Sequence, residues 1–145
     1  MKVFALFTAI ASVIATATAQ SATISLPANG TVIASGATFT IQLEQGDFPE
    51  NVNQVGIALG LAPCQYIDCN TYDASQEIGN LLYAGPFNPQ FGPGGPPSAE
   101  PFENFTVQAP SGVSGAYALS LTQLELIGDG YERVYLVSNI IVEIQ

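Results

Sequence analysis

The sequence predicts an all-β protein, an immunoglobulin-like two-sheet β-sandwich of about seven strands. Apolar residues alternate with polar or small ones along several short segments, as in strands with one buried face. Turn residues separate these segments about every dozen positions. No long segment repeats its apolar residues at helical spacing. About seven strands in a chain of this length favour a sandwich over a barrel.

The first half supplies three expected strands. Residues 22–27 form the first, and Asn29-Gly30 marks a turn after it. Residues 38–44 and 54–62 form the next two, and the second of these carries only glycine and alanine opposite its apolar positions, which allows close backbone approach. The side chains expected to face inward are Phe39, Ile41, Leu43, Val55, Ile57, Leu59 and Leu61.

The second half supplies four more: 78–83, 104–109, 116–127 and 134–144. Phe105 and Val107 are expected inward. In the long strand the apolar parity changes between Leu121 and Leu124, which predicts a β-bulge near Thr122 or Gln123.

The last strand is also apolar on its outer face, at Tyr135, Val137 and Ile141. One interpretation is that a neighbouring loop or the centre of the sheet covers these side chains. The other is that they form a docking face for a partner.

The N-terminus predicts a signal peptide over residues 1–19. Lys2 precedes a short apolar run, and Ala17-Thr18-Ala19 is a cleavage site for signal peptidase. We therefore expect a secreted, extracellular protein whose mature part, residues 20–145, is a single β-sandwich domain. The apolar run is too short for a membrane span.

Charge and composition exclude several functions. The mature chain has twelve carboxylates and one cation, Arg133, a formal charge of −11, so nucleic acid and anionic membranes are not expected partners. The absence of histidine removes the usual general base and the Ser-His-Asp and Cys-His mechanisms. A carboxylate pair could still cleave glycosides, but the acids are scattered, so we expect no enzyme.

No metal site or cofactor is expected. Asp68, Asp73 and Glu77 could supply oxygen ligands to calcium, but their spacing matches no calcium loop, and a solvated acidic loop is favoured. The sequence predicts a disulfide between Cys64 and Cys69, because the chain is expected to enter an oxidising compartment. This disulfide would stabilise a short local loop.

Two N-glycosylation sequons are present. Asn29-Gly30-Thr31 and Asn104-Phe105-Thr106 each match the acceptor motif. The parity that buries Phe105 points Asn104 to solvent, whereas Asn29 could instead serve only as a turn residue.

The stretch from Gly85 to Pro101 is rich in proline and glycine. Proline and glycine alone suggest a linker. A solvated linker has no use for aromatic side chains, however, and four lie in or beside this stretch: Tyr83, Phe87, Phe91 and Phe102. We therefore expect a folded loop anchored on the sandwich edge by Phe87 and Phe91.

The blocks "GIALGLA", "GNLLYAGPFNPQF" and "PFENFTV" resemble the fungal necrosis-inducing secreted protein family, the Nis-type effectors. The resemblance covers nearly the whole mature chain. It implies a non-enzymatic effector that binds host proteins and suppresses plant pattern-triggered immunity through receptor-associated kinases. It implies no catalytic residues.

The leading hypothesis is therefore a secreted interaction module. Its candidate contact residues are Tyr83, Phe87, Phe91, Tyr135, Val137 and Ile141. The alternative is a cell-wall or carbohydrate-binding β-sandwich that stacks Tyr66, Tyr72, Phe87 and Phe91 on sugar rings.

Overall fold

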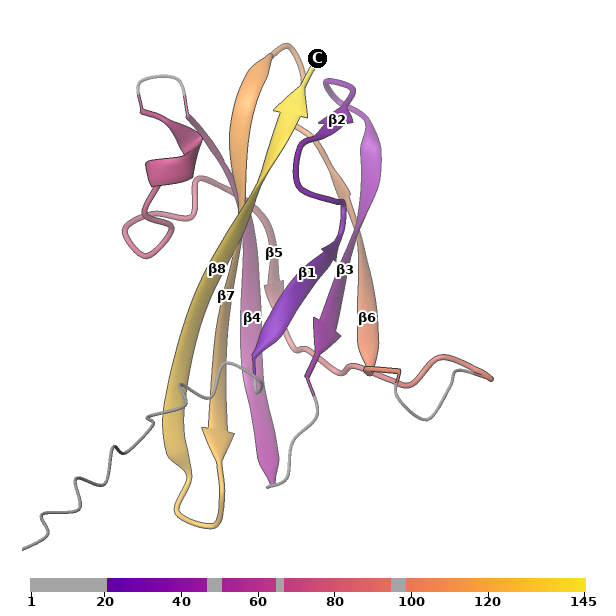
Figure 1. Cartoon of the computed structure of the whole chain (residues 1–145), viewed down its shortest axis with the longest axis vertical. Helices are drawn as coiled ribbons and strands as arrows, with labels where there is room; N and C mark the ends of the chain where they lie inside the picture. Colours follow the sequence, from indigo (N-terminus) through magenta and orange to yellow (C-terminus); the bar gives the residue numbers. More distant parts are fainter. Residues whose placement is uncertain (1–20, 47–50, 65–66, 95–98) are drawn as a thin grey trace, which may run out of the picture.

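Two facing β-sheets form the molecule (Figure 1). The computed structural model describes residues 21–46, 51–64, 67–94 and 99–145, so the predicted signal peptide lies outside the described residues. The smaller sheet has three antiparallel strands in the order β1 (Ala22–Leu26), β3 (Thr38–Gln45), β6 (Phe102–Gln108). The larger has five, in the order β2 (Thr31–Ile33), β8 (Glu132–Ile144), β7 (Gly115–Ile127), β4 (Val52–Pro63), β5 (Asn80–Gly85).

The predicted fold class is confirmed, with one strand more than expected. The additional strand is β2, three residues long, which pairs in parallel with β8, while the other neighbours in its sheet are antiparallel. A 3-10 turn, η1 (Cys69–Thr71), is the only helical element among the described residues. In that part of the chain, no helix has the length and apolar character needed to cross a membrane.

The core lies between the sheets and is built by period-2 alternation. Ile41 and Leu43 of β3 face Leu59 and Leu61 of β4, and all four are fully buried. Burying such a side chain contributes about 1.5–3 kcal/mol. Phe105 and Val107 of β6 also face inward, as predicted, and Phe39 packs half-buried against the cluster.

The predicted β-bulge is in the wrong strand. β7 pairs with β8 without a register shift, whereas the register of β4 against β7 shifts between Gln54 and Gly56. The extra residue, Val55, is 51% exposed instead of facing inward. The prediction failed because it assigned apolar side chains to the core, whereas β7 keeps one parity and turns Gln123 and Glu125 inward.

The outer face of β4 carries no bulky side chains at its glycine and alanine positions, and the loop after β4 lies directly on it. A Cβ at Gly60 would overlap the backbone and side chain of Ile78, and one at Gly79 would come within 2.6 Å of the Leu61 carbonyl oxygen. Ala118 and Ser120 of β7, on the same outer face, are fully buried. The close approach predicted from these small residues is confirmed.

The described part of the Gly85 to Pro101 stretch is a shaped loop. Phe87 is 3% exposed, belongs to the core and has its ring centroid 6.4 Å from that of Phe105. Gln90 and Phe102 exchange two backbone hydrogen bonds of 2.9 and 3.0 Å. Phe91 is 67% exposed, so the expectation that it anchors the loop is wrong. Residues 95–98 lie outside the described residues.

Phe87→Ala is expected to destabilise the fold by about 3–5 kcal/mol, since it leaves a cavity beside Phe105. Phe91→Ala, the matched control in the same loop, is expected to change stability by about 0.5 kcal/mol or less because its ring is in solvent. Urea unfolding of the three proteins measures both. Equal stability of the two variants would contradict the placement of Phe87.

Candidate functional site

The candidate residues of the last strand lie on the outer face of the five-stranded sheet. Cross-strand pairing extends each of them into a row of side chains across the sheet. The Tyr135 row continues through Leu124 and Gly56, the Val137 row through Thr122 and Ala58, and the Ile141 row through Ala118 and Ala62.

The outer face is covered at one end and open at the other. Ala62 and Ala118 are fully buried and Ile141 is half-buried, so the Ile141 row is largely covered. Tyr135 is 61% exposed. The interpretation that a neighbouring loop covers this face is confirmed for the Ile141 row, whereas the docking face stays a prediction for the exposed part around Tyr135.

We call the exposed part the open apolar face and define it by Val55, Leu124, Tyr135 and Val137. Val55 and Leu124 are 51% and 37% exposed, and Val137 is half-buried. Beside them runs a shallow groove of about 530 Å³. Its lining residues are Val55, Gly56, Ile57, Ala58, Gly85, Pro86, Thr122 and Leu124. The alternation of apolar residues predicts Val55 in the core and a bulge that would turn Leu124 inward, whereas both side chains are exposed.

The three aromatic candidates near the proline-rich loop do not join this face. Tyr83 turns inward, with its ring centroid 4.6 Å from that of Phe105 and its hydroxyl donating to the Pro86 carbonyl at 2.7 Å. Phe87 is buried and cannot contact a partner in this structure. Phe91 remains as a single exposed ring in the loop.

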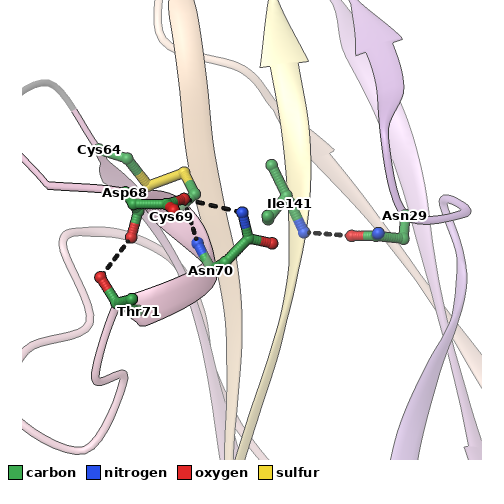
Figure 2. Close-up of a disulfide and its surroundings, with 7 residues drawn as sticks. All are labelled: Asn29, Cys64, Asp68, Cys69, Asn70, Thr71 and Ile141. Carbon is green, nitrogen blue, oxygen red and sulfur yellow. Dashed lines mark hydrogen bonds between the residues drawn. A yellow bond between two sulfur atoms is a disulfide. The ribbon is translucent and has the colours of Figure 1, made fainter.

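The predicted disulfide joins Cys64 to Cys69, with 5.3 Å between the Cα atoms (Figure 2). Next to it, Asp68 Oδ1 accepts hydrogen bonds from the backbone and side-chain nitrogens of Asn70, at 3.0 and 2.7 Å, which lower the pKa of Asp68. Residues 67–79, which contain Cys69 of this disulfide, are called the disulfide loop below.

The acids of the disulfide loop serve its own turns. Asp73 accepts hydrogen bonds from the hydroxyl and backbone N–H of Ser75, which lower the pKa of Asp73. Within the described residues, no three acidic or cysteine side chains gather as metal ligands would. The solvated acidic loop favoured from the sequence stays a prediction.

The aromatic residues of the carbohydrate alternative are dispersed. Tyr72 lies half-buried in the disulfide loop, Phe87 lies in the core, and Phe91 lies in the proline-rich loop. The two loops lie on opposite sides of the molecule in the view of Figure 1. Tyr66 lies outside the described residues.

The two sequons occupy different surroundings. Asn104 is exposed on the outer face of the three-stranded sheet, where its Oδ1 accepts from Gln42 Nε2 at 3.0 Å. Asn29 lies in the turn between β1 and β2, where its Oδ1 accepts from the backbone N–H of Ile141 at 2.8 Å (Figure 2). The turn role and the sequon therefore coincide at Asn29.

A buried polar cluster, which the alternation of apolar residues did not predict, closes one end of the core. Gln123 Nε2 donates to Oε1 of Gln45 and of Gln54, both at 2.9 Å, while Gln54 Nε2 donates to Glu125 Oε2 at 3.1 Å. Glu125 is fully buried, and its Oε1 has no hydrogen-bond partner among the described residues. Burial raises the pKa of Glu125, and the hydrogen bond from Gln54 opposes this in part.

Glu125→Gln is expected to stabilise the protein at neutral pH. The folded chain keeps the Glu125 proton to a higher pH than the unfolded chain, whose carboxyl has a pKa near 4.5, so stability falls as pH rises from 4.5 through the raised pKa. Each unit of that rise costs about 1.4 kcal/mol once the carboxyl is ionised. The glutamine variant, which keeps an acceptor for Gln54, lacks this fall.

Urea unfolding at several pH values between 4 and 8 measures the difference. Glu132→Gln, which removes an exposed carboxylate from the adjacent strand, is the matched control and is expected to follow the wild type. Parallel pH profiles for the wild type and Glu125→Gln would contradict the buried charge.

Comparisons with known proteins identify the family. The Nis1 family model matches residues 17–143. A search of curated proteins found no match. Among solved structures, a superoxide reductase (neelaredoxin) from Ignicoccus hospitalis is similar, with 14% identity, a TM-score of 0.44 and coverage of 86% of this chain and 81% of the other. A variant of that reductase has 16% identity, a TM-score of 0.43 and coverage of 86% and 82%.

These structural similarities are too weak to carry any argument about activity. The family match spans nearly the whole chain and agrees with the resemblance seen in the sequence. Together with the disulfide, it indicates a secreted, effector-like protein. The chain belongs to the Nis1 family.

Proposed function

We propose that this protein is a secreted, non-enzymatic effector that binds a host protein through the open apolar face. The observation that carries the proposal is the grouping of exposed apolar side chains on one sheet face, beside a groove lined mainly by apolar and small residues. A contiguous apolar surface of this kind marks an interaction site more often than scattered exposed residues do. Family membership supports the effector class.

Rigidity makes this face suited to protein recognition. Leu124 and Tyr135 lie on strands that are paired along their whole length, so their backbone positions are fixed before a partner arrives. Binding then costs little ordering of the backbone. Tyr135 is the natural centre of the contact, since tyrosine brings a large apolar ring and a polar hydroxyl.

Charge limits the class of partner. The whole chain carries twelve acidic residues against two basic ones, so a complementary surface is basic around an apolar centre. The partners we propose are receptor-associated kinases of a plant host, whose inhibition would suppress pattern-triggered immunity.

The alternative is a cell-wall or carbohydrate-binding module. It would need an exposed aromatic platform, and Tyr72, Phe87 and Phe91, the proposed rings within the described part of the chain, do not form one. Retention of the protein on insoluble chitin, glucan or cellulose would favour this alternative.

Tyr135→Ser is expected to weaken binding to the purified kinase domain of a plant receptor-associated kinase at least about tenfold, or about 1.4 kcal/mol. Stability should change little, since the ring is largely in solvent. Phe91→Ser is the matched control: it also removes an exposed ring, but away from the open apolar face, so wild-type affinity is expected.

Calorimetric titration of the three proteins against the same kinase domain measures the effect. Loss of binding in Phe91→Ser alone would move the contact to the proline-rich loop. Wild-type affinity in both variants would contradict the proposal that the open apolar face binds the kinase domain.

A further inference from the structure

A second cleft lies further along the same sheet, where three segments distant in sequence meet. They are the turn between β1 and β2, the disulfide loop and the outer edge of β8 (Figure 2). Its volume of about 380 Å³ is in the range of small-molecule sites. The lining residues are Asn29, Cys69, Asn70, Tyr72, Asn139, Ile140 and Ile141. We call it the Asn29 cleft.

The side chain of Asn29 is held in a fixed orientation at this cleft. Its Oδ1 accepts from the N–H of Ile141 at 2.8 Å, and the next residue, Gly30, donates its own N–H to the Ile141 carbonyl at 2.7 Å. These two bonds lead the chain into the parallel pairing of β2 with β8. Nδ2 of Asn29 has no hydrogen-bond partner among the described residues, so the atom that carries an N-linked glycan is available.

The lining of the cleft suits a neutral sugar. Besides Asn29, the attachment residue, the amides of Asn70 and Asn139 offer polar groups to hydroxyl and acetamide groups, and no ionisable acid or base lines the cleft apart from the Tyr72 phenol. Asn70 uses its nitrogen on Asp68, and its oxygen points toward the Ile141 side (Figure 2). The Tyr72 ring is held in place, because its hydroxyl donates to the Glu77 carbonyl at 2.6 Å.

We propose that the Asn29 cleft holds the first N-acetylglucosamine of a glycan attached to Asn29 Nδ2, and that this sugar fastens the disulfide loop against β8. Attachment forms a bond between Nδ2 and carbon C1 of the sugar and breaks the bond from C1 to the diphosphate of a lipid-linked oligosaccharide. Nδ2 loses one proton as the lipid diphosphate leaves, and nothing is oxidised or reduced. Oδ1 is not consumed, so the hydrogen bond from Ile141 persists.

The second sequon provides an internal comparison. Asn104 projects from the outer face of the three-stranded sheet and lines none of the clefts described above. A glycan there is expected to extend into solvent without ordering any loop. The proposal requires only secretion and is independent of the host partner.

The test uses protein secreted from a glycosylating yeast, with the variants Asn29→Asp and Asn104→Asp. Aspartate keeps an acceptor for the Ile141 N–H and removes the glycan. Intact mass is expected to show a glycan on Asn29 of the wild type. Hydrogen exchange of residues 67–79 is expected to be roughly threefold faster or more in Asn29→Asp and unchanged in Asn104→Asp.

A second arm separates an attached sugar from a free one. Unglycosylated protein from bacteria is titrated with N-acetylglucosamine and with chitin oligosaccharides and followed by NMR. Shifts confined to the cleft at millimolar sugar support the proposal, whereas micromolar binding of chitin oligosaccharides would show that the cleft serves a free saccharide. Three results would each overturn the proposal. They are a wild-type protein without a glycan on Asn29, unchanged hydrogen exchange of residues 67–79 in Asn29→Asp, and the absence of NMR shifts on addition of sugar.

Discussion

The contact between Gly60 and Ile78 is the constraint on which the outer surface depends. Because position 60 lacks a side chain, the disulfide loop can lie against the backbone of β4, an interior strand of the larger sheet. That placement buries Ala118 and Ser120 and brings the loop beside β8, so it creates both the covered end of the sheet and the Asn29 cleft. The open apolar face is the part of the same sheet that the loop does not reach.

Much of this architecture could be predicted from the sequence. Strict alternation identified seven of the eight strands and most of the core, because an inward apolar row is what the sandwich buries. The rule failed at Leu124, because Gln123 and Glu125 occupy the inward positions of β7, and at Val55, which is the extra residue of the bulge in β4. The β7–β8 hairpin, which turns at Gly128–Asp129–Gly130, could have predicted these orientations. Its strands pair continuously from Ile127 and Glu132, and this register fixes which residues of β7 and β8 share a face.

The candidate site was harder to predict, because exposure depends on contacts between distant segments. Tyr135 and Ile141 have the same parity in one strand, yet only the second lies under the disulfide loop. Phe87 and Phe91 are close in sequence, yet one fills the core and the other lies in solvent. Local composition could indicate that these rings matter, but only the packing of the two sheets decides which of them a partner can touch.

The parallel pairing of β2 with β8 affects the order of assembly. β2 occurs early in the chain, whereas its hydrogen-bonding partner β8 follows all the other strands of the described residues. Until β8 emerges, both β2 and the facing edge of β7 lack their neighbour. The larger sheet can therefore be completed only once β8 has been synthesised, and until then its unpaired edges are open to intermolecular association.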